Sequence, residues 1–227
     1  MKYDLHIHTY KSPCSNLKPI TILKTAKKKG LDGIAIVDHN TIQGGLEVKK
    51  LNKDKNFEVI VGSEISTKHG EIIGLYLKKE IKSRNILEVI KEIKKQGGLI
   101  IIPHPFTLGI FRKGAKSHLS KIKNKIDAIE AINCRCFFKS ENKKAFSFAK
   151  KNNLAKTAGS DAHFAPEIGK CCTIFDGNLK TSLKNKKTKV YGKTGFSLYW
   201  RGLSFLEKYF IKKLKCKKCK FNLNKLK

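Results

Sequence analysis

Histidines and acidic residues recur in short segments of this chain, and these are the side chains that bind transition-metal ions. The first segment is DLHIHT, residues 4–9, which places His6 and His8 two positions apart. Side chains alternate between the two faces of a strand, so both imidazoles would point the same way and reach one ion. Two surface histidines can have the same spacing, so the pair alone is a moderate signal for a metal site.

Four further segments repeat the pattern, because each places potential ligands directly after a short apolar run. The segments are IVDHN, VGSEIST, IIIPHPF and TAGSDAH, and they add Asp38, His39, Glu64, His104, Asp161 and His163. A core histidine or a helix-capping acid would explain any one of these residues, but packing does not explain five such segments. Imidazoles and carboxylates together suit Zn, Mn or Fe, and their number exceeds the needs of one ion. We therefore predict two or three divalent metal ions, with a carboxylate such as Glu64 as a bridge.

The elements that must position these ligands alternate between strands and helices. Apolar runs predict strands at 3–7, 33–37, 58–61, 71–77, 99–102, 127–132 and 155–158. Several runs are apolar on both faces, as strands of a parallel sheet are. Helical periodicity predicts helices at 20–29, 86–95 and 141–151. This alternation predicts a parallel α/β fold, either a barrel or an open sheet, with its site at the carboxyl ends of the strands.

The charge of the chain favours polyanionic partners without selecting one. Lys and Arg number 49 against 18 acidic residues, a formal net charge of +31. A basic surface attracts phosphates, so nucleic acid is a candidate partner. The lysines are spread over helix-like segments, however, as an AT-rich coding bias would leave them, and no basic stretch is interleaved with aromatic residues. No apolar run is long enough to span a bilayer, and Asp4 interrupts any signal-peptide pattern, so we expect a cytoplasmic protein without membrane contact.

The cysteines and the last fifty residues carry weaker signals. Seven cysteines, an odd number, argue against a disulfide framework, and Cys216 and Cys219 form a lone CxxC pair that we expect to be free thiols. Lysine is dense at 181–189, and 203–214 has the pattern of an amphipathic helix. We expect one domain over 1–178 and a Lys-rich, partly helical extension over 179–227.

In their order and separations, DLHIHT, VDHN, GSE, HP and GSDAH resemble the PHP (polymerase and histidinol phosphatase) family over residues 1 to 175. The resemblance implies a distorted (β/α)7 TIM-like barrel with a two- or three-metal centre at the carboxyl ends of its strands. Members of the family hydrolyse phosphate esters, among them histidinol phosphate, 3′,5′-bisphosphates, cyclic phosphodiesters and nucleic-acid ends. The metal ligands that it implies are His6, His8, His39, Glu64, His104, Asp161 and His163.

Three places depart from the family pattern and leave the third metal open. Cys14 stands where many members have a histidine or aspartate, and Glu71, near His69, stands where a further histidine is common. The segment 133–135 reads Asn, Cys, Arg where another ligand or substrate group often lies.

The expected function is hydrolysis of a phosphate ester on a small phosphorylated substrate by a metal-activated water. Asp38 or Asp161 is the candidate acceptor of the water's proton, and His39 or His163 is the candidate donor to the leaving oxygen. Arg135 is the candidate phosphate clamp, because a guanidinium matches phosphate oxygens in pairs; a surface cation is the alternative. Two other functions remain open: a nuclease or phosphodiesterase acting on nucleic-acid ends, and a metal-binding module without catalysis. The substrate, the metal and the oligomeric state are not determined.

Overall fold

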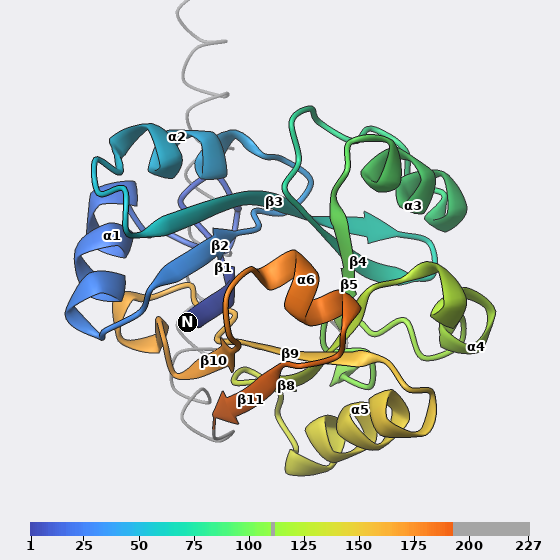
Figure 1. Ribbon diagram of the computed structural model, residues 1–227. Helices are drawn as coiled ribbons and strands as arrows, with labels where there is room; N and C mark the ends of the chain where they lie inside the picture. Colours follow the sequence, from blue (N-terminus) through green and yellow to red (C-terminus); the bar gives the residue numbers. More distant parts are fainter. Residues whose placement is uncertain (110–111, 193–227) are drawn as a thin grey trace, which may run out of the picture.

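Nine strands form one mixed sheet that curves into a nearly closed barrel (Figure 1). The computed structural model describes residues 1–109 and 112–192. In order across the sheet, the strands are β11 (Lys189–Gly192), β10 (Cys171–Ile174), β1 (Lys2–Ile7), β2 (Gly33–Ile36), β3 (Glu58–Thr67), β4 (Gly70–Leu75), β5 (Leu99–Ile102), β8 (Ala128–Asn133) and β9 (Ala155–Gly159). The chain after β9 returns to β1, where the His8 amide donates to the Ala162 carbonyl at 3.0 Å. The predicted distorted TIM-like barrel is confirmed.

Helices cover the outside of the barrel and account for its parallel strands. β1, β2 and β3 run parallel, as do β5, β8 and β9. The helices are α1 (Pro19–Lys28), α2 (Gln43–Leu51), α3 (Ile86–Lys95), α4 (Leu119–Ile122), which a 3-10 turn (Lys123–Lys125) follows, α5 (Lys139–Lys151) and α6 (Leu179–Lys184), with a second 3-10 turn at Ala165–Glu167. A short hairpin, β6 (Leu108–Gly109) with β7 (Arg112–Lys113), lies outside the main sheet. β4 pairs antiparallel with β3 and β5, and this reversal distorts the regular barrel order.

The barrel interior is apolar at the end where the parallel strands begin. Tyr3, Leu5 and Ile60 belong to one buried cluster there, and Leu179 and Leu183 of α6 join it. Figure 1 shows α6 lying across this end of the barrel. Because α6 closes the end where the strands begin, the site that the sequence predicts must open at the other end.

β1 and β8 each contain an irregularity that changes which way their side chains point. The register of β1 on β2 shifts between Asp4 and Ile7, and that of β8 on β9 shifts between Glu130 and Ile132. An extra residue in a strand turns the following side chains to the other face. Leu5 accordingly lies in the interior cluster, whereas Ile7 packs outside with the residues of α1. The bulge therefore directs His6 and His8 toward the mouth of the barrel.

The chain beyond residue 178 begins as part of the barrel. α6 contributes to the interior cluster and β11 pairs with β10, so both pack on the preceding domain. The expected helix at 203–214 and the Cys216 and Cys219 pair lie outside the described residues. No helix in the described ranges is long and apolar enough to cross a bilayer.

One disulfide bond joins Cys134, just after β8, to Cys171, the first residue of β10. The argument from the odd number of cysteines did not anticipate this bond. A count does not show which thiols meet, because that depends on residues 37 positions apart in the chain.

Candidate metal centre

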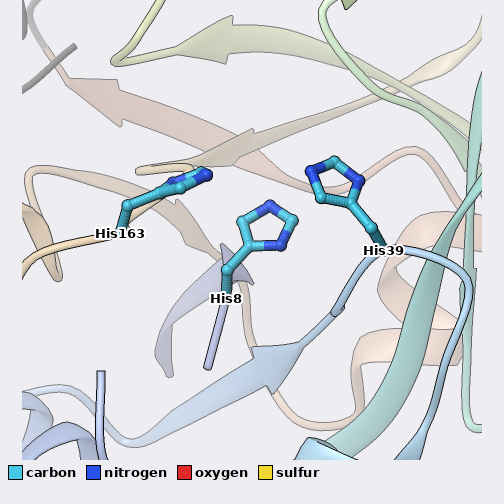
Figure 2. Close-up of side chains that lie close together, drawn as sticks. All are labelled: His8, His39 and His163. Atoms are coloured by element: carbon cyan, nitrogen blue, oxygen red, sulfur yellow. The ribbon is translucent and has the colours of Figure 1, made fainter. Parts of the chain in front are cut away.

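The seven predicted ligands lie together at the end of the barrel where the parallel strands finish. Their donor atoms fall into groups in which all atoms lie within 4.8 Å of one another, and the groups share members. The groups are His8 with His39 and His163; His6 with His8 and Asp161; His6 with Glu64 and His104; and His39 with Glu64 and Glu71. Figure 2 shows the imidazole of His8 between those of His39 and His163. The donors thus form one continuous cluster.

Hydrogen bonds behind the cluster decide which ring nitrogen of His6 and His8 faces it. His6 Nδ1 lies 2.9 Å from Glu130 Oε1, and an ionised carboxylate only accepts, so Nδ1 carries the hydrogen. Ser12 Oγ donates its one proton to Asp38 Oδ1 at 2.6 Å, so it accepts from His8 Nδ1 at 3.1 Å. When the two rings are neutral, as metal binding requires, both Nε2 atoms present lone pairs, and they lie 3.1 Å apart.

His163 also presents its Nε2 atom as an acceptor. Its Nδ1 donates to the Asp161 carbonyl at 2.8 Å, and Cys14 Sγ lies 3.0 Å from its Nε2. Burial, and then the positive charge of Arg135, lower the pKa of His163 well below its usual range. The ring is therefore neutral, which is the form that binds a metal ion.

Two buried carboxylates converge on the same space as these imidazoles. Glu64 Oε2 lies 3.5 Å from His6 Nε2 and 3.4 Å from His8 Nε2. Asp161 Oδ1 lies 3.7 Å and 3.4 Å from the same two atoms. Lone pairs and negative charges that face each other in a buried space repel unless a cation lies among them. The donor set therefore fits transition-metal ions.

The close approach of imidazoles and carboxylates shifts the pKa values of His6 and Glu64. Burial opposes a charge on His6, but the carboxylates of Asp161, Glu130 and Glu64 together raise its pKa well above its usual range. Burial alone would raise the pKa of Glu64, yet the facing imidazoles of His6 and His39 hold it well below its usual range. A proton on His6 thus occupies the position of positive charge that a metal ion would take.

Two of the predicted ligands have backbone angles that are uncommon for residues other than glycine. φ is 27° at His104 and 57° at Asp161. Such conformations cost about 1–3 kcal/mol each and persist only where the surroundings hold them. At His104 the backbone N–H donates to Glu130 Oε2 at 2.8 Å, which secures the turn between two prolines. The strained backbone at His104 and Asp161 therefore occurs where the chain places their side chains in the cluster.

Asp38 lies beside the grouped donors but is not one of them. Its Oδ1 accepts from the Thr9 amide at 2.7 Å and from Ser12 Oγ, and its Oδ2 accepts from Thr9 Oγ1 at 2.7 Å. A Cβ at Gly44 would lie only 2.0 Å from Oδ2. Asp38 therefore holds the loop after β1, and through Ser12 it reaches His8.

Arg135 is buried close enough to His163 for its charge to lower the pKa of that imidazole. Only 3% of the residue is exposed, and its Nε is 3.5 Å from Glu167 Oε1. Glu167 Oε2 in turn accepts from the amides of His163 at 2.9 Å and Phe164 at 3.1 Å. The ion pair thus supports the loop that carries His163.

Sequence reasoning missed Glu130 and left Glu71 undecided. Glu71 belongs to a donor group with His39 and Glu64, on the more open side of the cluster, where the His39 side chain is 27% exposed. An acid inside the apolar run AIEAIN was the signal for Glu130. The two remaining histidines, His69 and His118, stack on each other with ring centroids 3.5 Å apart and belong to none of these groups.

Comparison with known proteins assigns the family. The PHP domain family matches residues 4–157, which contain five of the seven predicted ligands; Asp161 and His163 lie just beyond this range. The chain belongs to the PHP domain family. A PHP-associated family also matches, over residues 139–184, so the PHP assignment extends across the loop that holds Asp161 and His163.

Sequence relatives of this PHP protein include two from Methanocaldococcus jannaschii, both described as uncharacterised. One is 52% identical over 118 residues, which are 47% of this chain and 69% of the relative. The other is 40% identical over 180 residues, which are 77% of this chain and 70% of the relative. A 5'-3' exoribonuclease of Haemophilus influenzae is 39% identical over 66 residues, which are 29% of this chain and 24% of the enzyme.

Solved structures confirm the fold of the PHP protein. A two-domain Bacteroides vulgatus protein containing a PHP-like metal-dependent phosphoesterase superposes with a TM-score of 0.69 at 18% identity, covering 85% of this chain and 64% of that one. PsfC from Pseudomonas syringae superposes with a TM-score of 0.67 at 16% identity, covering 92% of this chain and 98% of that one. At these identities the likeness concerns the barrel alone.

Proposed function

We propose that this PHP protein is a metal-dependent phosphoesterase that hydrolyses a phosphomonoester or nucleotide. The observation that carries the proposal is the convergence of imidazole lone pairs and buried carboxylates at the open end of the barrel. Metal ions would offset the repulsion among these donors, and the position of the donor set matches that of active sites in barrels of parallel strands.

The cluster would hold two or three ions of Zn, Mn or Fe through His6, His8, His39, Glu64, His104, Asp161 and His163. Bound ions would supply two effects: they lower the pKa of a coordinated water, and they offset charge on the phosphate oxygens. Glu64 has one oxygen near His104 and the other near His6, His8 and His39, as a residue shared between ions requires. Glu71 is a further candidate ligand.

Among the acid–base candidates, the contacts favour Asp161 over Asp38. Asp161 directs one carboxylate oxygen toward the imidazoles of His6 and His8, where the reaction would take place. Both oxygens of Asp38 accept hydrogen bonds from the loop after β1. We therefore assign Asp38 a positioning role. His39 is the most exposed of the imidazoles in the cluster, but burial lowers its pKa to about 4, so the ring is neutral near neutral pH and suits metal binding better than proton donation.

The position of Arg135 supports a role different from a phosphate clamp. A clamp must present its guanidinium to the substrate, whereas this side chain is buried and paired with Glu167 behind His163. We therefore assign it to the support of the His163 loop.

A nuclease is the second candidate function. The supporting observations are the identity with part of a 5'-3' exoribonuclease, the 37% identity over 87 residues with a PolC-type DNA polymerase III of Mycoplasmopsis pulmonis, and the charge of +31. A metal-binding module without catalysis is the third, and the complete donor set argues against it.

The test combines metal analysis with substrate turnover. Protein purified without chelator should contain about two or more Zn, Mn or Fe ions per chain. With Mn present, it should hydrolyse p-nitrophenyl phosphate faster than bis-p-nitrophenyl phosphate, and phosphorylated metabolites faster than short oligonucleotides. Faster hydrolysis of the diester and oligonucleotides would favour the nuclease. Bound metal without turnover of any phosphate ester would favour the module.

A further inference from the structure

We propose that Glu130 is a positioning residue of the metal centre, which sets the tautomer of His6 and, with Asn133, fixes ligands from three separate strand ends. The inference rests on the metal centre of the proposed function but not on the identity of its substrate. Glu130 and Asn133 lie in β8 and are 2% and 0% exposed.

The carboxylate of Glu130 accepts three hydrogen bonds, two of them from metal ligands. Oε1 lies 2.9 Å from His6 Nδ1. Oε2 accepts from the backbone N–H of His104 at 2.8 Å and from Asn133 Nδ2 at 2.9 Å. One side chain thereby orients the ring of His6 and holds the strained backbone of His104, although the two ligands come from β1 and from the loop after β5.

Asn133 extends this hydrogen-bond network, which already links His6 and His104 through Glu130, to a third candidate ligand. Its Nδ2 donates to Asp161 Oδ2 at 3.1 Å as well as to Glu130 Oε2. An amide suits this place because it offers hydrogens to two carboxylates, whereas an acid would add a third negative charge. The bulge in β8 makes this network possible. Residues three apart in a regular strand point to opposite faces, but the extra residue in β8 turns both Glu130 and Asn133 toward the site.

A carboxylate at position 130 is required for the His6 tautomer that leaves Nε2 available to a metal. In Glu130→Gln, the single amide oxygen would best replace Oε2, which has two donors facing it. The amide NH2 would then face His6 Nδ1, which must accept, so the hydrogen moves to Nε2. An imidazole protonated at Nε2 cannot bind the ion through that atom. The opposite amide orientation would place the NH2 group against two other donors.

The experiment measures metal affinity and the His6 tautomer in the full-length protein. Glu130→Gln should bind Mn²⁺ about 10–100-fold more weakly than the wild type, by equilibrium titration with detection of free Mn²⁺ by EPR. Nitrogen NMR of the zinc-loaded wild type should show the assigned Nδ1 of His6 protonated, and the variant should lose that signal.

Glu141→Gln is the matched control. Glu141 is also 2% exposed, and its Oε2 accepts the amides of Phe137 and Phe138 at the start of α5, outside the donor groups. It should lose stability while keeping wild-type Mn²⁺ affinity. Equal weakening in both glutamine variants, or wild-type affinity in Glu130→Gln, would overturn the proposal.

Asn133→Ala provides a second route if Glu130→Gln does not fold. It removes the link to Asp161 but leaves Glu130 beside His6, so Mn²⁺ affinity should fall about tenfold with the His6 tautomer unchanged. Unchanged Mn²⁺ affinity in this variant would contradict the positioning role assigned to Glu130 and Asn133. A wild type that binds metal but hydrolyses no phosphate ester would contradict the proposed function and leave this inference standing.

Discussion

His6 and His8 show how single side chains acquire a metal-binding form from the residues behind them. A histidine has two ring nitrogens, and the one that is free to bind a metal depends on the hydrogen bond of the other. Glu130 accepts directly from His6, while Asp38 acts on His8 through the hydroxyl of Ser12. Glu130 and Asp38 thus orient the imidazole rings of His6 and His8 in addition to adding negative charge near the cluster.

Asp161→Asn should reduce turnover more than about 100-fold, since it removes a negative ligand that faces both His6 and His8. Turnover of p-nitrophenyl phosphate with saturating Mn measures the effect. Asp176→Asn, an exchange at an exposed residue on the loop before α6, should retain wild-type activity. Wild-type turnover in the Asp161 variant would refute the role assigned to this residue.

Metal affinity should rise with pH. The pKa of His6 is raised well above its usual range, so the metal-free ring keeps a proton near neutral pH that a metal ion must displace. Each proton released makes apparent affinity about tenfold weaker for every pH unit below the pKa. Titration calorimetry in two buffers of different ionisation enthalpy, from about pH 6 to about pH 8, should show proton release. Affinity that is independent of pH would contradict this prediction.

The strands place the ligands through departures from regular geometry. The bulges in β1 and β8 redirect His6 and Asn133, and the close approach of β9 to β1 requires a residue without a side chain. At Gly159, the last residue of β9, an added Cβ would lie 2.3 Å from His6 Cβ and 2.8 Å from Glu130 Oε1. Glycine at this position therefore lets β9, β1 and β8 meet beneath the metal centre.

Gly159→Ala should lower the free energy of unfolding by about 1–3 kcal/mol through overpacking, and it should weaken Mn²⁺ binding. Urea unfolding and metal titration measure the two effects. Gly177→Ala is the control, because nothing lies within 4 Å of its added Cβ and its φ of +67° costs about 1 kcal/mol by itself. The control should keep wild-type metal affinity. Equal metal affinity in both variants would show that Gly159 does not shape the site.

In the described part of the molecule, segments far apart in the sequence are linked beside the site. β10 and β11 extend the sheet beyond β1, and the disulfide between Cys134 and Cys171 ties β10 to the loop after β8. Arg135, in the same loop after β8, pairs with Glu167 in the 3-10 turn that precedes β10. A covalent bond and an ion pair thus close the barrel beside the His163 loop.

Replacing both Cys134 and Cys171 by Ala should lower the free energy of unfolding by about 2–4 kcal/mol, since the bond spans 37 residues of chain. Urea unfolding under non-reducing conditions measures the loss, and reductant should shift the wild type in the same direction. Cys172→Ala, at a neighbouring buried free thiol, is the control for lost packing alone. A wild-type midpoint that does not change with reductant would contradict a stabilising disulfide.

Much of the fold and most of the site followed from local patterns. The seven predicted strands all occur, and the helices at 86–95 and 141–151 match α3 and α5 closely. α2, with its two glycines, and the short strand β10 were missed, because their patterns are too short or too weak to recognise. The convergence of the seven candidate ligands was predictable because metal binding favours a few residue types, and a barrel of parallel strands places its site at the strand ends.

Residue types and their spacing therefore determined the strands, the parallel α/β arrangement and the donor set of this PHP protein, and the resemblance to the family added the barrel. Only the tertiary structure decided the atomic arrangement: the lone pairs that face inward, the support from Glu130, the burial of Arg135 and the disulfide. The physical reason is distance along the chain. His6 and Glu130 are 124 residues apart, and the one-residue bulge in β1, which no local pattern marks, decides whether they meet.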